Sequence, residues 1–248
     1  TAPSVVAVFT AEDFRGQIGI VPCAAQLPDL KPAPRPVLAT GRVRFVGEAV
    51  AVVIASDRYA LRDALDLVDV DYEPLTPVVD PEKAIRKGAP VLHEPSTDNV
   101  SFRWELEGGD VKKAFKNAYK VIRQRMLNQR LVPVAMEPRG VLAEFKPGEK
   151  TLTVWSSTQI PHLLKTQIAA MLGTPEHSVR VITPEVGGGF GSKLNVYPEE
   201  AIVAHLSMRL GHPVKWMESR RENFLCTTHG RDQIADVEAA VSKDGILL

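Results

Sequence analysis

Four glycines lie within five consecutive positions of residues 186–193, which read Val-Gly-Gly-Gly-Phe-Gly-Ser-Lys. Glycine loses more conformational freedom on folding than other residues, at a cost of roughly 0.5–1 kcal/mol each relative to alanine in regular structure. A cluster of this kind is therefore expected where the backbone must lie directly against a ligand or adopt a positive φ. The chemistry it predicts is the docking of an anionic group on main-chain N–H donors.

The elements around this loop favour the same interpretation, since a strand is predicted over 178–182 and a helix over 198–210. Two familiar phosphate loops nevertheless fail on spacing. A P-loop starting at Gly187 and a dinucleotide fingerprint starting at the same residue both require glycine where the chain has Ser192. A glycine-rich surface turn without a ligand stays open as the alternative.

Protein-held metal is disfavoured by the histidines and cysteines. The six histidines, at 93, 162, 177, 205, 212 and 229, show no ligand spacing, and Cys23 and Cys226 have no CxxC partner. Cys226 and His229 are three positions apart, which is weak evidence for a site. Two cysteines are too few for a disulfide framework, so a reducing, cytoplasmic setting is favoured.

Five segments together carry a resemblance that covers essentially the whole chain. They are Gly41–Val50, Val68–Leu75, Trp155–His162, Gly187–Lys193 and Pro213–Phe224. The last three, in that order, resemble the molybdopterin-binding large subunit of the xanthine dehydrogenase, aldehyde oxidase and aerobic carbon monoxide dehydrogenase family. The first two resemble the small α/β hammerhead domain that precedes the cofactor domain in those enzymes.

The resemblance implies an α/β (α+β) chain with a hammerhead-like domain over 1–100 and the N-terminal part of a mixed α/β molybdopterin-binding domain over 101–248. It implies a molybdenum hydroxylase that oxidises an aldehyde, an N-heterocycle or carbon monoxide with water-derived oxygen. The cofactor would be molybdenum-molybdopterin, in a cytosine dinucleotide form in some members. Iron–sulfur clusters and FAD are expected on a small and a medium partner subunit, in a dimer of heterotrimers.

The resemblance also implies the site residues. Gln159 would hydrogen-bond a molybdenum oxygen, and Gly188, Gly189, Phe190 and Gly191 would contact the cofactor through their backbone, with the Phe190 ring against the metal pocket. No protein ligand to the metal is expected, because the pterin holds it. Without the neighbouring motifs, Gln159 is more simply a cap of the following helix, and an aromatic residue such as Phe190 is more often a core anchor than the wall of a site.

Three neighbouring residues refine these expectations. Lys193 is expected to face solvent, as most lysines do. Leu194 stands where the purine-oxidising branch carries a glutamate, which disfavours a purine and resembles the carbon monoxide dehydrogenase-like branch. Glu137, between apolar residues, is a candidate for a raised pKa, but pairing with Arg139 or another arginine is the expected explanation of its presence there.

Composition bounds the function further. The chain of 248 residues carries 30 basic and 30 acidic side chains, so it offers no general attraction to nucleic acid. The chain has no run of about 18 uncharged apolar residues that would predict a membrane span.

By resemblance the chain is a fragment that lacks the general base and the remainder of the subunit. A noncatalytic phosphate-ligand module and a nicotinamide-dependent oxidoreductase stay as alternatives.

Hydrophobic periodicity and turn signals predict the elements and a boundary near 93–108. Strands are predicted over 5–10, 43–55, 68–72, 119–129, 140–145, 151–156, 179–182, 214–217 and 234–241. Helices are predicted over 58–67, 110–118, 161–172 and 198–210, with a helical turn over 83–88, a further helix starting at Arg220 and a hairpin turn over 242–245.

Overall fold

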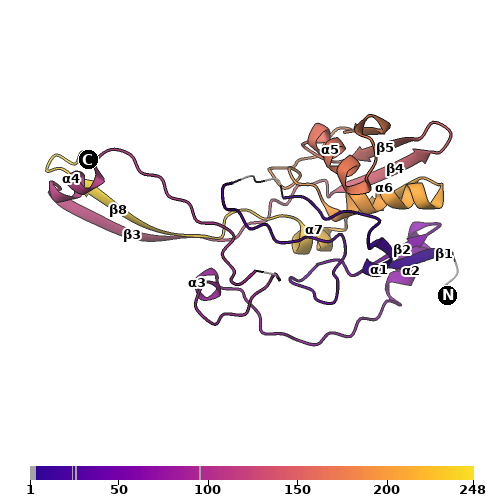
Figure 1. Ribbon diagram of the computed structural model, residues 1–248, viewed down its shortest axis with the longest axis horizontal. Coiled ribbons are helices and arrows are strands. Elements are labelled where there is room, and N and C mark those ends of the chain that lie inside the picture. The colour runs from indigo at the N-terminus through magenta and orange to yellow at the C-terminus, as the bar shows by residue number, and fades with distance from the viewer. Residues whose placement is uncertain (1–3, 24, 26, 95) are drawn as a thin grey trace.

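The computed structural model describes residues 4–23, 25, 27–94 and 96–248. A body made of two lobes occupies one end of the longest axis, and a long two-stranded ribbon projects from it at the other end (Figure 1). Among the described residues, no helix combines the length and the apolar character needed to cross a bilayer.

A four-stranded sheet forms the centre of the larger lobe. Its order is β6-β5-β4-β7, with β5 and β6 parallel and the other pairs antiparallel. Every second side chain of β5 is buried, as expected for a strand that packs one face against helices. The strands are β4 (Gly140–Lys146), β5 (Thr151–Ser156), β6 (Val179–Ile182) and β7 (Val214–Met217).

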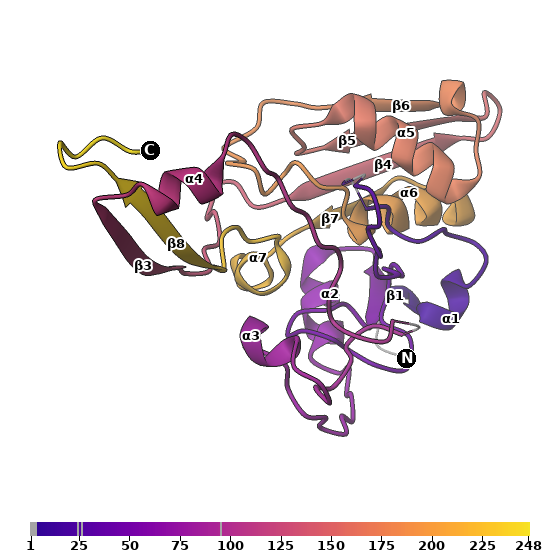
Figure 2. The same cartoon turned by 60° about the vertical axis from the view of Figure 1, so that its left-hand side comes forward.

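Two helices, α5 (Pro161–Leu172) and α6 (Pro198–Leu210), pack against this sheet and against each other (Figure 2). Each begins with proline, whose fixed φ suits the first helical position. Each ends at a glycine in the left-handed conformation, Gly173 and Gly211 respectively. The short 3-10 helix η1 (Glu176–Ser178) leads from α5 into β6, which completes a β–α–β crossover between parallel neighbours.

The smaller lobe is built from the N-terminal part of the chain and docks on α6. The antiparallel pair β1 (Val5–Thr10) and β2 (Ala51–Ala55) is accompanied by α1 (Ala11–Phe14) and α2 (Arg58–Leu65). Phe14 meets the His205 ring edge-on at 5.8 Å, and the Arg209 guanidinium lies 4.8 Å from the Phe9 ring centroid. Phe9 and Phe14 are thereby part of one core shared with the sheet lobe.

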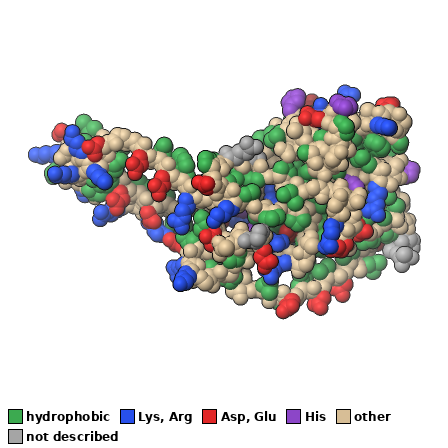
Figure 3. Space-filling model, in the orientation of Figure 1, with side chains coloured by type: hydrophobic (Ala, Val, Ile, Leu, Met, Phe, Trp, Pro, Cys, Tyr) green, Lys and Arg blue, Asp and Glu red, His purple; other side chains and the backbone are tan. Residues whose placement is uncertain are grey.

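The projecting ribbon pairs strands that are far apart in the sequence, β3 (Lys120–Asn128) and β8 (Gln233–Val241). Ion pairs Arg123–Glu238 and Arg125–Asp236 cross between them, and charged side chains of both signs follow the ribbon on the surface (Figure 3). The remaining helices are α3 (Pro81–Ala84), α4 (Val111–Lys116) and α7 (Arg220–Cys226).

Two predicted strands are wrong. Of residues 43–55 only Ala51–Ala55 pair, because a turn in which Glu48 N–H donates to the Phe45 carbonyl at 3.2 Å, with Gly47 at φ +100°, interrupts the stretch. Residues 68–72 are irregular and their apolar side chains are largely exposed. The β-branched composition of that segment favours a strand, but none of the strands in the described ranges supplies the hydrogen-bonded partner that a strand requires.

Smaller differences concern the first lobe. The helix after Asp57 ends at Leu65, and the helical turn predicted over 83–88 begins earlier, where the Asp80 carboxylate caps α3 with a proline in its first turn. The elements of the sheet lobe are confirmed, with α5, α6, β5, β6 and β7 at their predicted bounds. The mixed α/β class is confirmed as well.

Candidate functional site

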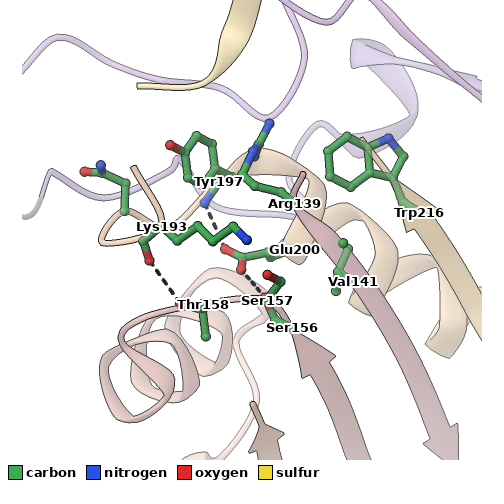
Figure 4. Close-up of a pocket in the computed structure, with 11 residues that line it drawn as sticks. Arg139, Val141, Ser156, Ser157, Thr158, Lys193, Tyr197, Glu200 and Trp216 are labelled. Atoms are coloured by element: carbon green, nitrogen blue, oxygen red, sulfur yellow. Dashed lines mark hydrogen bonds between the residues drawn. The ribbon is translucent and has the colours of Figure 1, made fainter. Parts of the chain in front are cut away.

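The candidate site lies where the carboxyl ends of the parallel strands β5 and β6 meet. Residues 157–160 lead from β5 into α5, and residues 183–197 lead from β6 into α6. Ligands of α/β folds commonly bind at this edge of a sheet, because loops from neighbouring strands converge there. Figure 4 shows a pocket beside this edge, whose lining includes Ser156 to Thr158 at the end of β5, Lys193 after β6 and Glu200 of α6.

Gln159 is tied to the glycine-rich loop by its backbone and its side chain. Its N–H donates to the Lys193 carbonyl at 3.0 Å, and its Oε1 accepts from the Gly191 N–H at 3.1 Å. The side chain does not cap α5, so that alternative is wrong. Among the described residues no acceptor pairs with Nε2, which leaves an exposed amide donor beside the loop.

The loop itself presents a row of backbone donors. In the part of the chain that the structure describes, the N–H groups of Gly188, Gly189 and Phe190 have no acceptor. Positive φ values at Gly188 (+95°), Phe190 (+51°) and Gly191 (+92°) bend the backbone here. Successive N–H groups in such a bend form a concave site suited to an anion or an electron-rich oxygen. The turn is closed by Ser192, whose N–H and Oγ both donate to the Gly189 carbonyl.

Phe190 stands out from the loop, with 76% of its surface exposed. The core-anchor alternative for this residue is therefore wrong. A positive φ is uncommon for a residue with a bulky side chain and is sustained only where the surroundings hold it. An exposed aromatic ring beside unpaired backbone donors is an arrangement suited to contact with a ligand or another polypeptide segment.

Lys193 is buried, contrary to the expectation that it faces solvent. Its side chain is 1% exposed, and Nζ donates to a Glu137 carboxylate oxygen at 2.8 Å and to the Glu137 carbonyl at 3.0 Å. Glu137 thus pairs with lysine rather than arginine, which corrects the second expectation. Burial opposes its ionisation, but hydrogen bonds from Lys193, Ser157 and Gly187 outweigh that effect and hold the pKa of Glu137 below its usual range.

A second buried charge network lies behind the loop. The Arg139 guanidinium donates from Nε to Glu218 at 2.9 Å and from Nη1 to Glu199 at 3.1 Å. It also lies 3.7 Å from the Tyr197 ring centroid and 5.2 Å from that of Trp216. Burial disfavours the charge on Arg139, but the attraction of the two carboxylates is stronger and raises its pKa. These contacts join the start of β4, the start of α6 and the end of β7.

Glu200 differs from Glu137 and Glu218, because burial outweighs hydrogen bonding in setting its pKa. Its Oε1 accepts from Ser156 Oγ at 2.6 Å and its Oε2 from the Tyr197 N–H at 3.0 Å. Burial raises its pKa to about 7, against these two hydrogen bonds. Glu200 and Ser156 line a cavity of about 10 Å³, close to the room that a single water molecule needs.

The Cys226–His229 pair does not form a metal site. Cys226 Sγ donates to the Glu222 carbonyl at 2.9 Å, and burial raises its pKa to about 11. His229 Nδ1 is hydrogen-bonded to Arg130 at 2.8 Å. Over residues 4–23, 25, 27–94 and 96–248, no group of three or more His, Cys, Asp or Glu side chains is arranged to hold a metal ion.

Two family models match the chain. Residues 92–248 match the molybdopterin cofactor-binding domain family, more than half of the chain. The chain belongs to that family. Residues 1–76 match the a/b hammerhead domain of aldehyde oxidase and xanthine dehydrogenase.

Individual relatives match nearly the whole length of the chain. It is 38% identical over 243 residues to the nicotine 6-hydroxylase large subunit of Paenarthrobacter nicotinovorans and 37% identical over 262 residues to the carbon monoxide dehydrogenase large chain of Afipia carboxidovorans. Quinoline 2-oxidoreductase from Pseudomonas putida 86 superimposes with a TM-score of 0.92 at 36% identity, over 99% of this chain and 31% of that one. The aligned regions include 98% and 99% of this chain but only 30% and 31% of the two relatives, so the chain spans about a third of their length.

Within this member of the molybdopterin cofactor-binding family, the structure brings Gln159 into contact with the loop that contains Gly188–Gly191. Sequence reasoning missed that Ser157, Glu137 and Lys193 converge beneath the same loop. One signal was present, since Glu137 stands between apolar residues, which predicts a buried and therefore paired carboxylate. Nothing in the sequence indicated which of 30 basic side chains would be its partner.

Proposed function

We propose that this chain is the part of a molybdenum hydroxylase large subunit that holds the molybdopterin cofactor at residues 187–193. The observation that carries the proposal is that, within the described part of the chain, the N–H groups of Gly188, Gly189 and Phe190 and the Nε2 of Gln159 have no hydrogen-bond partner. In this proposal the three backbone donors bind the cofactor, and the Gln159 amide donates to an oxygen on the metal.

The residues present fit such a group. The bend offers hydrogen-bond donors and, within the described residues, no cluster of metal-ligating side chains accompanies it. That donor set suits a prosthetic group that brings its own sulfur ligands to the metal and needs only placement from the protein. At Gly189 the lack of a Cβ lets the Gln159 side chain lie directly against the loop backbone.

When bound, the group supplies a molybdenum centre that accepts two electrons from the substrate while a water-derived oxygen is transferred. The chain's own residues place that centre. Gln159 orients it through Nε2, because Oε1 is already engaged by Gly191 at 3.1 Å. Phe190, 76% exposed, forms an apolar wall of the substrate space.

The substrate proposed is an aldehyde, an N-heterocycle or carbon monoxide. Leu194, 47% exposed, offers neither charge nor hydrogen bond next to the loop, which argues against a purine gripped by a carboxylate at this position. The names of the relatives, which mention nicotine, carbon monoxide and quinoline, support small substrates of this range.

The partners proposed are the remainder of the large subunit, an iron–sulfur subunit and an FAD subunit, in a cytoplasmic dimer of heterotrimers. Relatives described as large subunits or large chains support a multi-subunit enzyme. We also propose that the domain boundary lies near residue 100, with the hammerhead-like domain over 1–100 and the cofactor domain over 101–248, and that the pterin carries a cytosine dinucleotide.

Metal and cofactor analysis of the full-length protein, purified with its natural partners, tests the proposal. Molybdenum together with a released pterin, in equal amounts with the large subunit, is the expected result. A bound nicotinamide would favour the dinucleotide-dependent oxidoreductase instead. A preparation with neither, which binds inorganic phosphate at the glycine-rich loop, would favour the noncatalytic module.

A further inference from the structure

The Glu137 carboxylate joins both ends of the glycine-rich loop. Its Oε2 accepts from the Gly187 N–H at 2.8 Å, from Ser157 Oγ at 2.8 Å and from Lys193 Nζ at 2.8 Å. Gly187 begins the loop and Lys193 ends it, so one oxygen atom fixes the distance across the turn. Ser157 adds the segment that carries Gln159, two residues further along the chain.

Backbone contacts of the same residues tighten this arrangement. The Glu137 N–H donates to the Gly187 carbonyl at 3.2 Å, and Lys193 Nζ donates to the Glu137 carbonyl at 3.0 Å. The Gly187 backbone lies so close that a Cβ on it would stand 2.6 Å from the Glu137 Cβ. The Glu137 side chain is therefore packed closely against Gly187 as well as hydrogen-bonded to it.

Charge and burial make the pair a strong tie. The Lys193 side chain is 1% exposed, and a buried ammonium without its partner is strongly destabilising. The Glu137 side chain is 35% exposed. The buried Lys193 ammonium therefore needs the Glu137 carboxylate to offset its charge, whereas the carboxylate is also in contact with solvent. The ammonium cannot exchange the carboxylate for solvent without moving the end of the loop.

We propose that Glu137 and Lys193 are positioning residues that hold the N–H groups of residues 188–190 and the amide of Gln159 in their binding arrangement before the cofactor arrives. This inference rests on the proposed function. The Lys193 backbone carbonyl accepts from the Gln159 N–H, so the tie on the Lys193 side chain also sets the place of Gln159. A loop closed in advance binds more tightly because less conformational entropy is lost on binding.

Hydrogen exchange of the full-length subunit, prepared without cofactor, tests the tie on its own. Lys193→Met keeps the apolar stem and removes the ammonium. We expect the peptide covering residues 187–194, where Gly191 and Ser192 donate hydrogen bonds, to exchange at least tenfold faster, and peptides from β4 and β5 to keep their rates. Lys146→Met, which removes an exposed lysine 3.8 Å from Glu149, is the matched control and should change neither.

If Lys193→Met does not fold because Glu137 is left without its partner, the double variant Glu137→Gln with Lys193→Met removes both charges and should fold with the same fast exchange at 187–194. Unchanged exchange there, or an equal increase throughout the sheet, would overturn the proposal, because the pair would then hold no loop or hold only the fold.

A second measurement reports positioning in the loaded enzyme. The electron paramagnetic resonance spectrum of the molybdenum centre should change in Lys193→Met and return toward that of the wild type in Lys193→Arg, which restores a cation. Identical spectra in all three would overturn the positioning role. A wild-type protein without molybdenum or pterin would refute the proposed function, while the exchange measurement would still decide whether the pair holds the loop.

Discussion

The Gln159 side chain occupies the space that a Cβ of residue 189 would need. A Cβ built on Gly189 would lie 2.6 Å from Gln159 Cδ, closer than non-bonded carbon atoms approach each other. The same amide accepts from the Gly191 N–H at 3.1 Å, so the two residues pack together because one of them is glycine. The residue types at 159 and 189 therefore depend on each other.

Gly189→Ala tests this dependence. The added methyl group should push the Gln159 amide away from the Gly191 N–H and destabilise the chain by roughly 1–3 kcal/mol, the usual cost of overpacking. In a Gln159→Ala background the same substitution should cost far less, since the colliding group is gone. Denaturant unfolding of the four proteins of this double-mutant cycle measures the coupling. Gly148→Ala is the control, because a Cβ added at Gly148 would meet no heavy atom within 4 Å. Equal destabilisation by Gly189→Ala in both backgrounds would contradict the dependence.

Gln159→Ala tests the proposed function at its first residue. In the complete enzyme we expect turnover to fall by about 10²-fold with molybdenum still bound, because one donor aimed at the reacting centre is lost while the backbone donors of the loop stay. Steady-state kinetics with metal analysis of the same preparation checks this. Gln17→Ala, at an exposed glutamine, serves as the control. Turnover equal to that of the wild type would remove Gln159 from the mechanism.

The sequence predicts the sheet lobe well because its signals are local. Proline at 161 and 198 begins α5 and α6, and a glycine after Leu172 and after Leu210 ends them, each for reasons that lie within one or two residues of the helix end. The strands of the sheet carry apolar residues at every second position, which indicates that one face is buried whatever the partner strand is. Local rules of this kind do not depend on the rest of the molecule.

Residues 43–50 and 68–72 show where local rules fail. Their β-branched side chains favour strands, but a strand exists only where another strand pairs with it, and pairing is decided by chain topology. The partner of Glu137 is a similar case. A buried carboxylate predicts a cation nearby, but Lys193 is 56 positions away and reaches Glu137 because β4, which follows Glu137, and β6, which precedes Lys193, belong to one sheet with β5 between them.

The candidate site also has a part that the sequence predicts and a part that only the folded structure shows. Gln159 and the glycines could be named because each belongs to a contiguous motif with its own chemistry. Their mutual contact, and the fact that the Gln159 Nε2 stays free while its Oε1 is used, are properties of the folded loop and have no counterpart in residue spacing.

Arg139 provides a third prediction, on stability. Arg139→Met would leave the Glu218 carboxylate, whose side chain is 0% exposed, without its cation, and should destabilise the chain by about 3–5 kcal/mol. Arg123→Met is the matched control. The Arg123 and Glu238 side chains are 74% and 49% exposed, so their ion pair should contribute at most about 1 kcal/mol. Denaturant unfolding of both variants measures the difference. Equal losses would mean that the buried network behind the loop is no more important than a surface pair.

Glu200 provides the last prediction, on pH. Burial raises its pKa to about 7 from a usual value of 4.5, so between these values the folded state binds more protons at this site than the unfolded state does. Stability contributed by the neutral carboxyl is thus fully present below about pH 4.5 and is lost as the pH rises toward about 7, by an amount on the order of 3 kcal/mol.

Glu200→Gln keeps a neutral side chain that can still accept from Ser156 or from the Tyr197 N–H. We expect the free energy of unfolding of this variant, relative to that of the wild type, to rise between about pH 5 and about pH 8, because only the wild type has a buried carboxyl to ionise there. Denaturant unfolding at these two pH values measures it. Glu149→Gln, which removes an exposed carboxylate, should follow the wild-type profile. A difference between Glu200→Gln and wild type that stays constant with pH would show that Glu200 is ionised throughout and that its burial is offset by contacts stronger than the two hydrogen bonds it accepts.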